Sequence, residues 1–193
     1  MYFRKLTGKK CYLSPIDLGD AEKFTGWLND LEVTENLSLY PQAISLEGEK
    51  DILGRVASGH NYSIIDIATN ELLGNCGFVS VDHLNQTAEV GIFIGNKDYW
   101  SKGYGSEALR LLMDFGFKAL NLHNIGLTAY SFNKRAIKCY EKIGFRLMGK
   151  RREALLRGKD RFDIIHMDIL RSEFYENHNG KCPCTANLEG TAV

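Results

Sequence analysis

The chain has 193 residues, of which 24 are basic and 24 acidic, so its formal net charge at pH 7 is zero. This length favours one domain with a sizeable core, and a 44% hydrophobic and 25% charged composition is ordinary for a globular protein. Zero net charge argues against bulk attraction to nucleic acid or to an anionic membrane. No apolar run approaches the ~20 residues that cross a bilayer. We therefore expect neither a nucleic-acid nor a membrane partner.

The cysteines and the N-terminal residues both indicate a cytoplasmic protein. An odd number of scattered cysteines makes a poor disulfide framework, and the opening residues lack the apolar core of a secretory signal. The pair Cys182 and Cys184 is too closely spaced for a zinc knuckle, and the histidines form no ligand pattern. We expect no metal. The five cysteines are Cys11, Cys76, Cys139, Cys182 and Cys184.

Strands and helices follow one another without an interdomain linker. In the first half, periodicity predicts a strand at 10–16, a helix at 20–29, an irregular segment at 30–44, and a helix at 46–57 capped by Ser45. Strands are predicted at 62–67, 72–79 and 88–94. The sequence after residue 100 predicts a strong amphipathic helix through Leu109 to Leu120, and a strand at 125–130.

The end of the chain is predicted to hold a second short helix and two more strands. Asn133 caps a helix from Lys134 to Ile143, and Gly144 ends it. Strands at 145–148 and 162–170 then flank an Arg-rich turn at 150–161, and residues 177–193 read as a disordered tail after a domain of residues 1–176. This order predicts a single α/β or α+β domain whose last crossover is a right-handed βαβ unit.

A glycine-rich turn, Trp100-Ser101-Lys102-Gly103-Tyr104-Gly105-Ser106, opens the strong helix. Backbone N–H groups and the helix dipole converge there on one point, which suits a phosphate or pyrophosphate, and Lys102 adds a full charge at the rim. The residues after Gly105 do not fit a P-loop, and the following strand lacks the acidic end of a dinucleotide fold. The alternative is a turn that merely starts a helix.

A second motif, Asn133 to Phe145, follows the next strand. With both motifs in this order, the chain resembles the GNAT N-acetyltransferase superfamily, in element order from Asp17 to Phe174. Asn121-Leu122-His123 and Arg161-Phe162-Asp163 are similar to the branch that acetylates ribosomal-protein N-termini and polyamines. The resemblance implies a mixed, mostly antiparallel sheet of about six or seven strands, about four helices, and one splayed strand pair.

The resemblance also implies the cofactor-binding residues. The Gly103-Tyr104-Gly105 turn with Ser106 would bind the pyrophosphate of acetyl-CoA, and the strand ending Ile92-Phe93-Ile94 would pair with pantetheine. Asn133 would hydrogen-bond pantetheine, Ala136 would lie beside the cofactor, and Tyr140 would protonate the departing thiolate. Trp100 departs from the family pattern, which often has Gln or Arg there, so the resemblance implies a turn that binds through its backbone donors without that charged support.

Acyl transfer to an amine needs a base, because an alkyl ammonium has no lone pair. Glu89 is the candidate, since a carboxylate in an apolar strand invites a functional interpretation. Alternatives are an exposed strand start for Glu89, a water molecule as base, and a core role for Tyr140. Glu32 and Glu35 are candidates for attracting a cationic amine, although a solvated surface is the favoured interpretation for each. Lys150-Arg151-Arg152 reads as a solvated edge.

These observations predict an acetyl-CoA-dependent N-acetyltransferase. The acceptor is a primary amine, on a protein N-terminus, a polyamine or another small molecule, and it attacks the thioester directly in a ternary complex. No cysteine is expected to act as nucleophile, because Cys139 points about 100° away from Tyr140 on the helix. The rivals are a non-catalytic acyl-CoA-binding module and a nucleotide-binding oxidoreductase. The oligomeric state, monomer or homodimer, is left open.

Overall fold

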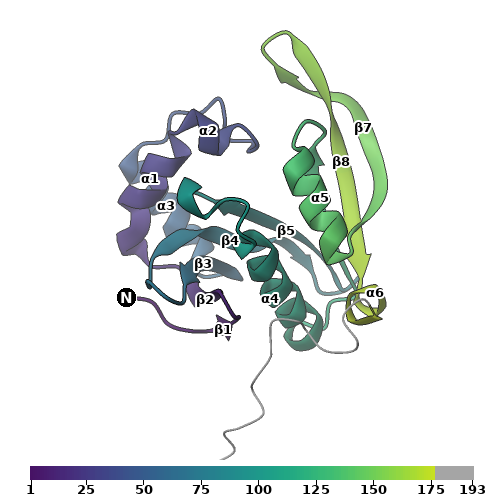
Figure 1. The fold of residues 1–193 in the computed structure, drawn as a ribbon, viewed down its shortest axis with the longest axis horizontal. Helices are drawn as coiled ribbons and strands as arrows, with labels where there is room; N and C mark the ends of the chain where they lie inside the picture. Colours follow the sequence, from purple (N-terminus) through teal and green to yellow (C-terminus); the bar gives the residue numbers. More distant parts are fainter. Residues whose placement is uncertain (177–193) are drawn as a thin grey trace, which may run out of the picture.

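A computed structural model describes residues 1–176 of the chain. In this part, eight strands form one sheet in the order β1-β2-β3-β4-β5-β6-β8-β7. Figure 1 shows the sheet running from β1 and β2 at one edge to β8 and β7 at the other. Neighbouring strands are antiparallel except for the parallel pair of β5 and β6. The strands are β1 Leu6–Thr7, β2 Cys11–Pro15, β3 Asn61–Asp66, β4 Leu72–Asp82, β5 Thr87–Ile94, β6 Asn124–Tyr130, β7 Arg146–Arg157 and β8 Asp160–Leu170.

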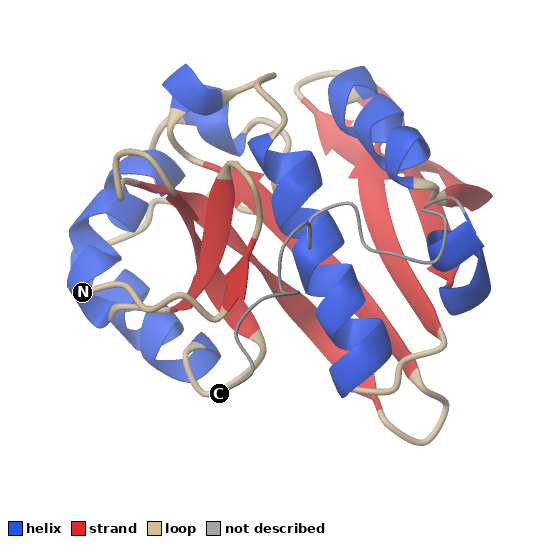
Figure 2. Ribbon diagram, turned by 60° about the horizontal axis from the view of Figure 1, so that its bottom comes forward, coloured by secondary structure: helices blue, strands red, loops and turns tan. Residues whose placement is uncertain are grey.

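Helices cover both faces of this sheet. The long helix α4 lies across the strands in Figures 1 and 2, and it shares a buried core with α5 and with Val90 and Ile125 of the central strands. On the other face, α1 and α3 enclose a smaller core around Phe24 and Ile65. The α-helices of the described residues are α1 Ala21–Leu28, α2 Leu31–Thr34, α3 Leu46–Val56, α4 Tyr104–Ala119, α5 Lys134–Ile143 and α6 Arg171–Glu176.

Side-chain caps fix the ends of two predicted helices. The Ser45 hydroxyl accepts a hydrogen bond from the Gly48 amide at the start of α3. The Asn133 side chain accepts from the Ala136 amide at the start of α5, and Gly144 ends that helix with a φ of 116°. A left-handed residue at this position suits glycine because it lacks a Cβ. The predicted boundaries of α5 are confirmed.

The parallel pair of β5 and β6 separates part-way along its length. Thr87, Ala88 and Glu89 pair with Asn124, Ile125 and Gly126, and no register pair follows Glu89. Beyond it, β5 stays paired with β4, and β6 stays paired with β8. The edge of β5 that faces β6 is therefore open from Val90 to Ile94, as the predicted splay requires.

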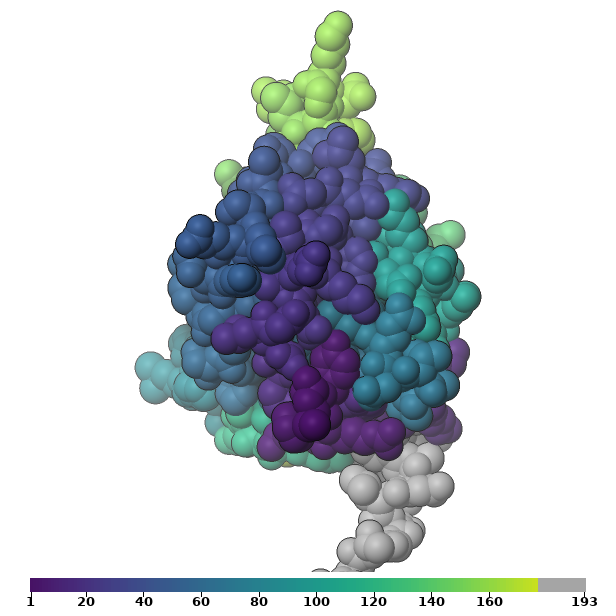
Figure 3. Space-filling view, turned by 90° about the vertical axis from the view of Figure 1, so that its left-hand side faces the viewer, coloured from purple at the N-terminus to yellow at the C-terminus, as the bar shows by residue number. Residues whose placement is uncertain are grey.

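The prediction of an Arg-rich turn at 150–161 is wrong. Residues 146–157 form β7, which pairs with β8 in a long hairpin whose tip projects from the molecule in Figure 3. β7 is the last strand of the sheet, and most of its side chains are exposed. Lysine and arginine side chains suit such an edge because they discourage pairing with another chain.

The described part of the chain also has more elements than predicted. It holds eight strands, where about six or seven were expected, and the short β1 had no signal in the sequence. The irregular segment at 30–44 contains the one-turn helix α2. No helix among residues 1–176 has the length and apolar character needed to span a membrane.

Candidate active site

One cavity of about 750 Å³ occupies the gap between β5 and β6 and reaches both faces of the sheet. Most residues predicted to bind the cofactor line it, together with both predicted catalytic residues. The glycine turn and α5 form its wall on the α4 side, and α2 with the segment after it forms the wall on the other face. The predicted residues in the wall are Glu89, Ile92, Phe93, Ile94, Gly103, Tyr104, Gly105, Ser106, Asn133, Ala136 and Tyr140.

The glycine turn presents backbone amides to this cavity. Gly103 has a φ of 89°, a left-handed conformation in which a side chain is strained. The Glu107 amide makes the first helical bond, to the Gly103 carbonyl at 3.1 Å. The three amides before it have no acceptor within the helix, so the first turn of α4 offers donors and a positive dipole end to an anion.

Gly105 keeps the approach to these amides open. A Cβ built on Gly105 would lie 3.7 Å from Ile92 and 3.8 Å from Ile94, which is ordinary contact. The larger atoms of a longer side chain would then fill the groove between α4 and β5. Hydrogen bonds anchor the first turn of α4 to the start of β2. The Glu107 carboxylate accepts from the backbone amides of Lys10 at 2.7 Å and Cys11 at 3.2 Å.

Lys102 does not join the other predicted cofactor residues. Its ammonium lies 5.8 Å from the centre of the Tyr99 ring, and its carbonyl accepts from the Lys10 ammonium at 2.8 Å. The residue is absent from the cavity wall. Local sequence placed Lys102 beside the turn, but the positive φ of Ser101, 59°, redirects the chain there.

Trp100, the departure from the family pattern, ties the turn to the splayed strand. Its indole N–H donates to the Ile94 carbonyl at 2.7 Å. The Arg135 guanidinium stacks on the indole at 4.6 Å from the ring centre, and both residues line the cavity. Arg135 thus brings to this wall the positive charge that Trp100 lacks.

Tyr140 packs at the junction of α5 with the core. Its ring contacts Phe145 edge-on at 6.0 Å between ring centres, and it lies against the core on the α4 side. Burial raises the pKa of Tyr140 to about 12, with a smaller contribution from Cys139. The phenol therefore keeps its proton at neutral pH and is able to donate it.

Cys139, which was expected to point in a different direction from Tyr140, also lines the cavity. Its sulfur lies 3.1 Å from the Ser106 hydroxyl, at the first turn of α4. The thiol therefore faces the glycine turn, near the expected pyrophosphate.

Glu89 is the last residue of β5 that pairs with β6. Its side chain is exposed, and it lines the cavity at the point where the strands separate. The exposure of the Glu89 side chain agrees with the alternative of a solvated strand start. Its position where β5 and β6 separate nevertheless leaves the carboxylate within reach of the gap.

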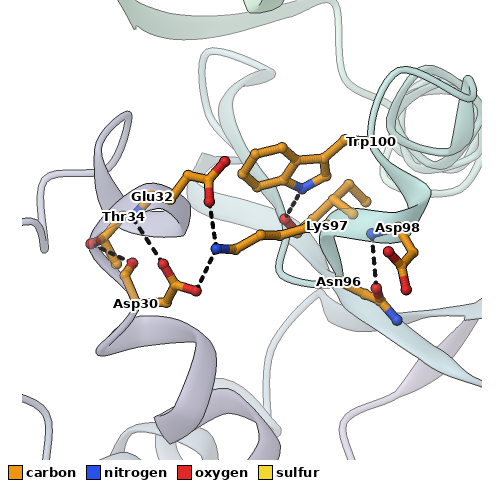
Figure 4. A network of polar contacts seen from close by, with 8 residues as sticks. Asp30, Glu32, Thr34, Asn96, Lys97, Asp98 and Trp100 are labelled. Atoms are coloured by element: carbon orange, nitrogen blue, oxygen red, sulfur yellow. Dashed lines mark hydrogen bonds and ion pairs between the residues drawn. The ribbon is translucent and has the colours of Figure 1, made fainter.

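The acidic residues of the 30–44 segment differ in their surroundings. Glu32 lines the cavity, and its carboxylate is paired with the Lys97 ammonium at 2.6 Å. Lys97 also contacts Asp30 at 2.7 Å, as Figure 4 shows. Glu35 is exposed and lies outside the cavity wall.

Sequence reasoning missed several basic residues of the site. Arg135, Lys138 and Lys142 line the cavity from one face of α5. Their spacing of three and four residues was a readable signal for a shared helix face. Lys97 gave no such signal, because its partner Glu32 is 65 positions away. Across residues 1–176, no three His, Cys, Asp or Glu side chains are grouped to hold a metal ion.

Comparison with known proteins identifies the family. The model of the acetyltransferase (GNAT) domain matches residues 10–146. The chain belongs to the GNAT family. It is 30% identical to the uncharacterized N-acetyltransferase p20 of Bacillus licheniformis, over 90% of this chain and 97% of that protein. This GNAT chain is accordingly an N-acetyltransferase, as its two motifs indicated.

Solved GNAT structures share the fold. The acetyltransferase (GNAT family) from Bacillus anthracis superposes with a TM-score of 0.77 at 25% identity, covering 90% of this chain and all of that one. The spermidine N-acetyltransferase from Vibrio cholerae, in complex with CoA and spermine, gives 0.76 at 21% identity, covering 86% of this chain and 98% of that one. The predicted fold class and splayed strands are confirmed.

Proposed function

We propose that the cavity binds acetyl-CoA on its α4 side and a primary amine on its other side, and transfers the acetyl group directly between them. One observation carries this proposal: the anion-binding turn, the open edge of β5 and the protonated Tyr140 all line one cavity. These are the groups that a thioester substrate with a diphosphate requires.

The donor would lie along the splay. The amides at the start of α4 suit its diphosphate, and Arg135 adds charge beside them. The unpaired edge from Val90 to Ile94 suits an extended amide-containing arm, which adds to the sheet as a strand would. The thioester then reaches the gap near Tyr140. The CoA in the Vibrio cholerae structure supports this choice of donor.

The reaction balances with two proton transfers. The neutral amine nitrogen attacks the thioester carbon, a C–N bond forms, and the C–S bond breaks. Glu89, directly or through water, takes a proton from the amine, and Tyr140 gives a proton to the leaving thiolate. Amide donors on the open edge of β5 would stabilise the oxyanion.

A continuous assay of thiol release from acetyl-CoA tests the proposal. Acceptors are a peptide with a free N-terminus, a monoamine and a polyamine. We expect release with at least one of them, and a loss of about tenfold or more at neutral pH in Glu89→Gln. Turnover of this variant should recover as pH rises, since more amine is then already neutral.

Glu35→Gln is the matched control, because Glu35 is an exposed carboxylate outside the cavity wall. It should leave turnover unchanged. Binding of acetyl-CoA without thiol release on any amine would replace the proposal with an acyl-CoA sensor. Equal turnover by both glutamine variants would remove Glu89 from the mechanism and leave water as the base.

A further inference from the structure

The cavity wall opposite α4, here called the acceptor end, has an unusual balance of charge. It is formed by Glu32, Val33, Leu37, Val79, Glu89 and Tyr130. Its carboxylates are Glu32 and Glu89, and they differ sharply in their surroundings.

Glu32 is paired with Lys97. The Lys97 ammonium lies between two carboxylates, 2.6 Å from Glu32 and 2.7 Å from Asp30 (Figure 4). Hydrogen bonds to Asp30 and then Glu32 raise the pKa of Lys97. The same contact lowers the pKa of Asp30. Lys97 and Asp30 are therefore charged at neutral pH. Lys97 offsets one of the two carboxylate charges, and its ion pair with Glu32 occupies the one carboxylate of the cluster that lines the cavity.

A second cation lies behind the acceptor end. Arg157, near the tip of the β7–β8 hairpin, donates to the Leu37 carbonyl at 2.9 Å. Its guanidinium stacks on Tyr40 at 4.4 Å and on Tyr130 at 5.5 Å from the ring centres. Leu37 and Tyr130 both belong to the acceptor end, so a permanent positive charge lies one residue behind its wall.

Glu89 is left as the carboxylate without a cationic partner among the described residues of the acceptor end. If Glu89 takes the proton of the reacting amine, Glu89 is occupied by that amine. A second ammonium on the same acceptor would meet Lys97 or Arg157, both already positive, and would find no unpaired carboxylate in the wall.

We infer that the acceptor end selects amines with a single positive charge, such as a peptide α-amino group or a simple monoamine, and that Lys97 and Arg157 set this selectivity. The inference rests on the proposed function and specifies its acceptor. Such selectivity would distinguish this chain from enzymes that acetylate polyamines. A polyamine carries two or more ammonium groups, and these need several unpaired carboxylates.

A matched pair of acceptors isolates charge from shape. Pentylamine and 1,5-diaminopentane share a chain length and a reacting amine, and they differ by one ammonium. After correction for the two equivalent amines of the diamine, we expect wild-type kcat/KM to favour pentylamine by about tenfold at low salt. Added NaCl should reduce the preference, because it screens charge.

Two charge-removing variants test the named residues. Lys97→Gln and Arg157→Gln should each raise the ratio of diamine to monoamine kcat/KM by about threefold or more. Lys97→Arg should keep the wild-type ratio. Lys50→Gln removes an exposed charge from α3, outside the cavity wall, and should also leave the ratio unchanged.

The ratio is informative even where a variant is partly unfolded, because both acceptors are measured on one preparation and the active fraction cancels. A purely structural role for Lys97 or Arg157 would slow both acceptors alike. Wild-type preference for the diamine, or an unchanged ratio in both glutamine variants, overturns the inference and leaves the proposed function standing. Absence of turnover with every amine overturns the proposed function itself and the inference with it.

Discussion

At the scale of single residues, Tyr140 makes the sharpest prediction. Its phenol is held in the cavity wall with a pKa raised to about 12 by burial. We expect Tyr140→Phe to lower kcat by ~10²-fold or more with little change in acetyl-CoA affinity, as for the loss of a general acid. Steady-state kinetics and calorimetric binding measure the two effects separately.

The raised pKa gives this assignment a pH signature. A group with a raised pKa keeps its proton as pH rises past its ordinary value, so wild-type kcat should not fall through loss of the Tyr140 proton up to about pH 10. Undiminished turnover in Tyr140→Phe would return Tyr140 to the role of a core side chain beside Phe145.

Gly105 tests the binding turn. In Gly105→Val, the side chain would fill the groove beside Ile92 and Ile94, so we expect CoA affinity to fall about tenfold or more, which is about 1.4 kcal/mol. Gly26→Val is the control, because Gly26 is also helical, has no atom near its added Cβ, and lies outside the cavity wall. Equal CoA affinity in the two variants would contradict the proposed cradle.

Residues of the site could be found from the sequence where their signal is local. The glycines of the turn, the cap Asn133 and Tyr140 each belong to a short motif next to a periodic helix. Lys97 and Arg157 have partners 65 and 120 positions away. Those contacts exist because the fold brings α2 beside the segment after β5, and the residues after α2 beside the β7–β8 hairpin. No spacing in a single sequence reports such contacts.

At the scale of elements, α5 begins at a residue that both caps the helix and faces the cavity. The Asn133 side chain caps the helix by accepting from the Ala136 amide at 3.1 Å, and it also lines the cavity. Asn133→Ala should destabilise the protein by about 1 kcal/mol through loss of the cap, measured by urea unfolding.

Asn133→Asp separates the two tasks. Aspartate caps a helix as well as asparagine does, but it has no amide donor and brings a negative charge to the cavity. We expect its stability to match the wild type while CoA affinity falls. Wild-type CoA affinity in this variant would limit Asn133 to capping.

The elements also show where sequence reasoning fails. Helices α3 and α5 were predicted closely because Ser45, Asn133 and Gly144 mark their ends. The second part of β7 was missed, although strands were predicted at 145–148 and 162–170. It belongs to an exposed edge strand, and its run of Lys and Arg lacks the apolar alternation by which strands are recognised. Its pairing with β8 also shifts register twice, which further obscures the pattern.

At the scale of the whole molecule, the splay lets one cavity extend between opposite faces of the sheet. The glycine turn and α5 border the cavity on one side, and α2 and Glu89 border it on the other. Lys97 and Trp100 link these halves, through Asp30 and Glu32 and through the Ile94 carbonyl. If the cavity binds the two substrates as proposed, each would have its own wall in one continuous space, and both could be bound at once.

This architecture predicts a sequential kinetic mechanism without an acetylated enzyme. Initial velocities measured against acetyl-CoA and amine should give intersecting double-reciprocal lines. Cys139 provides the test of the alternative, since its thiol lines the cavity and lies 3.1 Å from the Ser106 hydroxyl. Because that position faces the anion-binding turn and not the end near Tyr140, Cys139→Ala should retain turnover within about threefold. Parallel lines, acetyl transfer to the protein in the absence of amine, and inactivity of Cys139→Ala would together establish a covalent route through this cysteine.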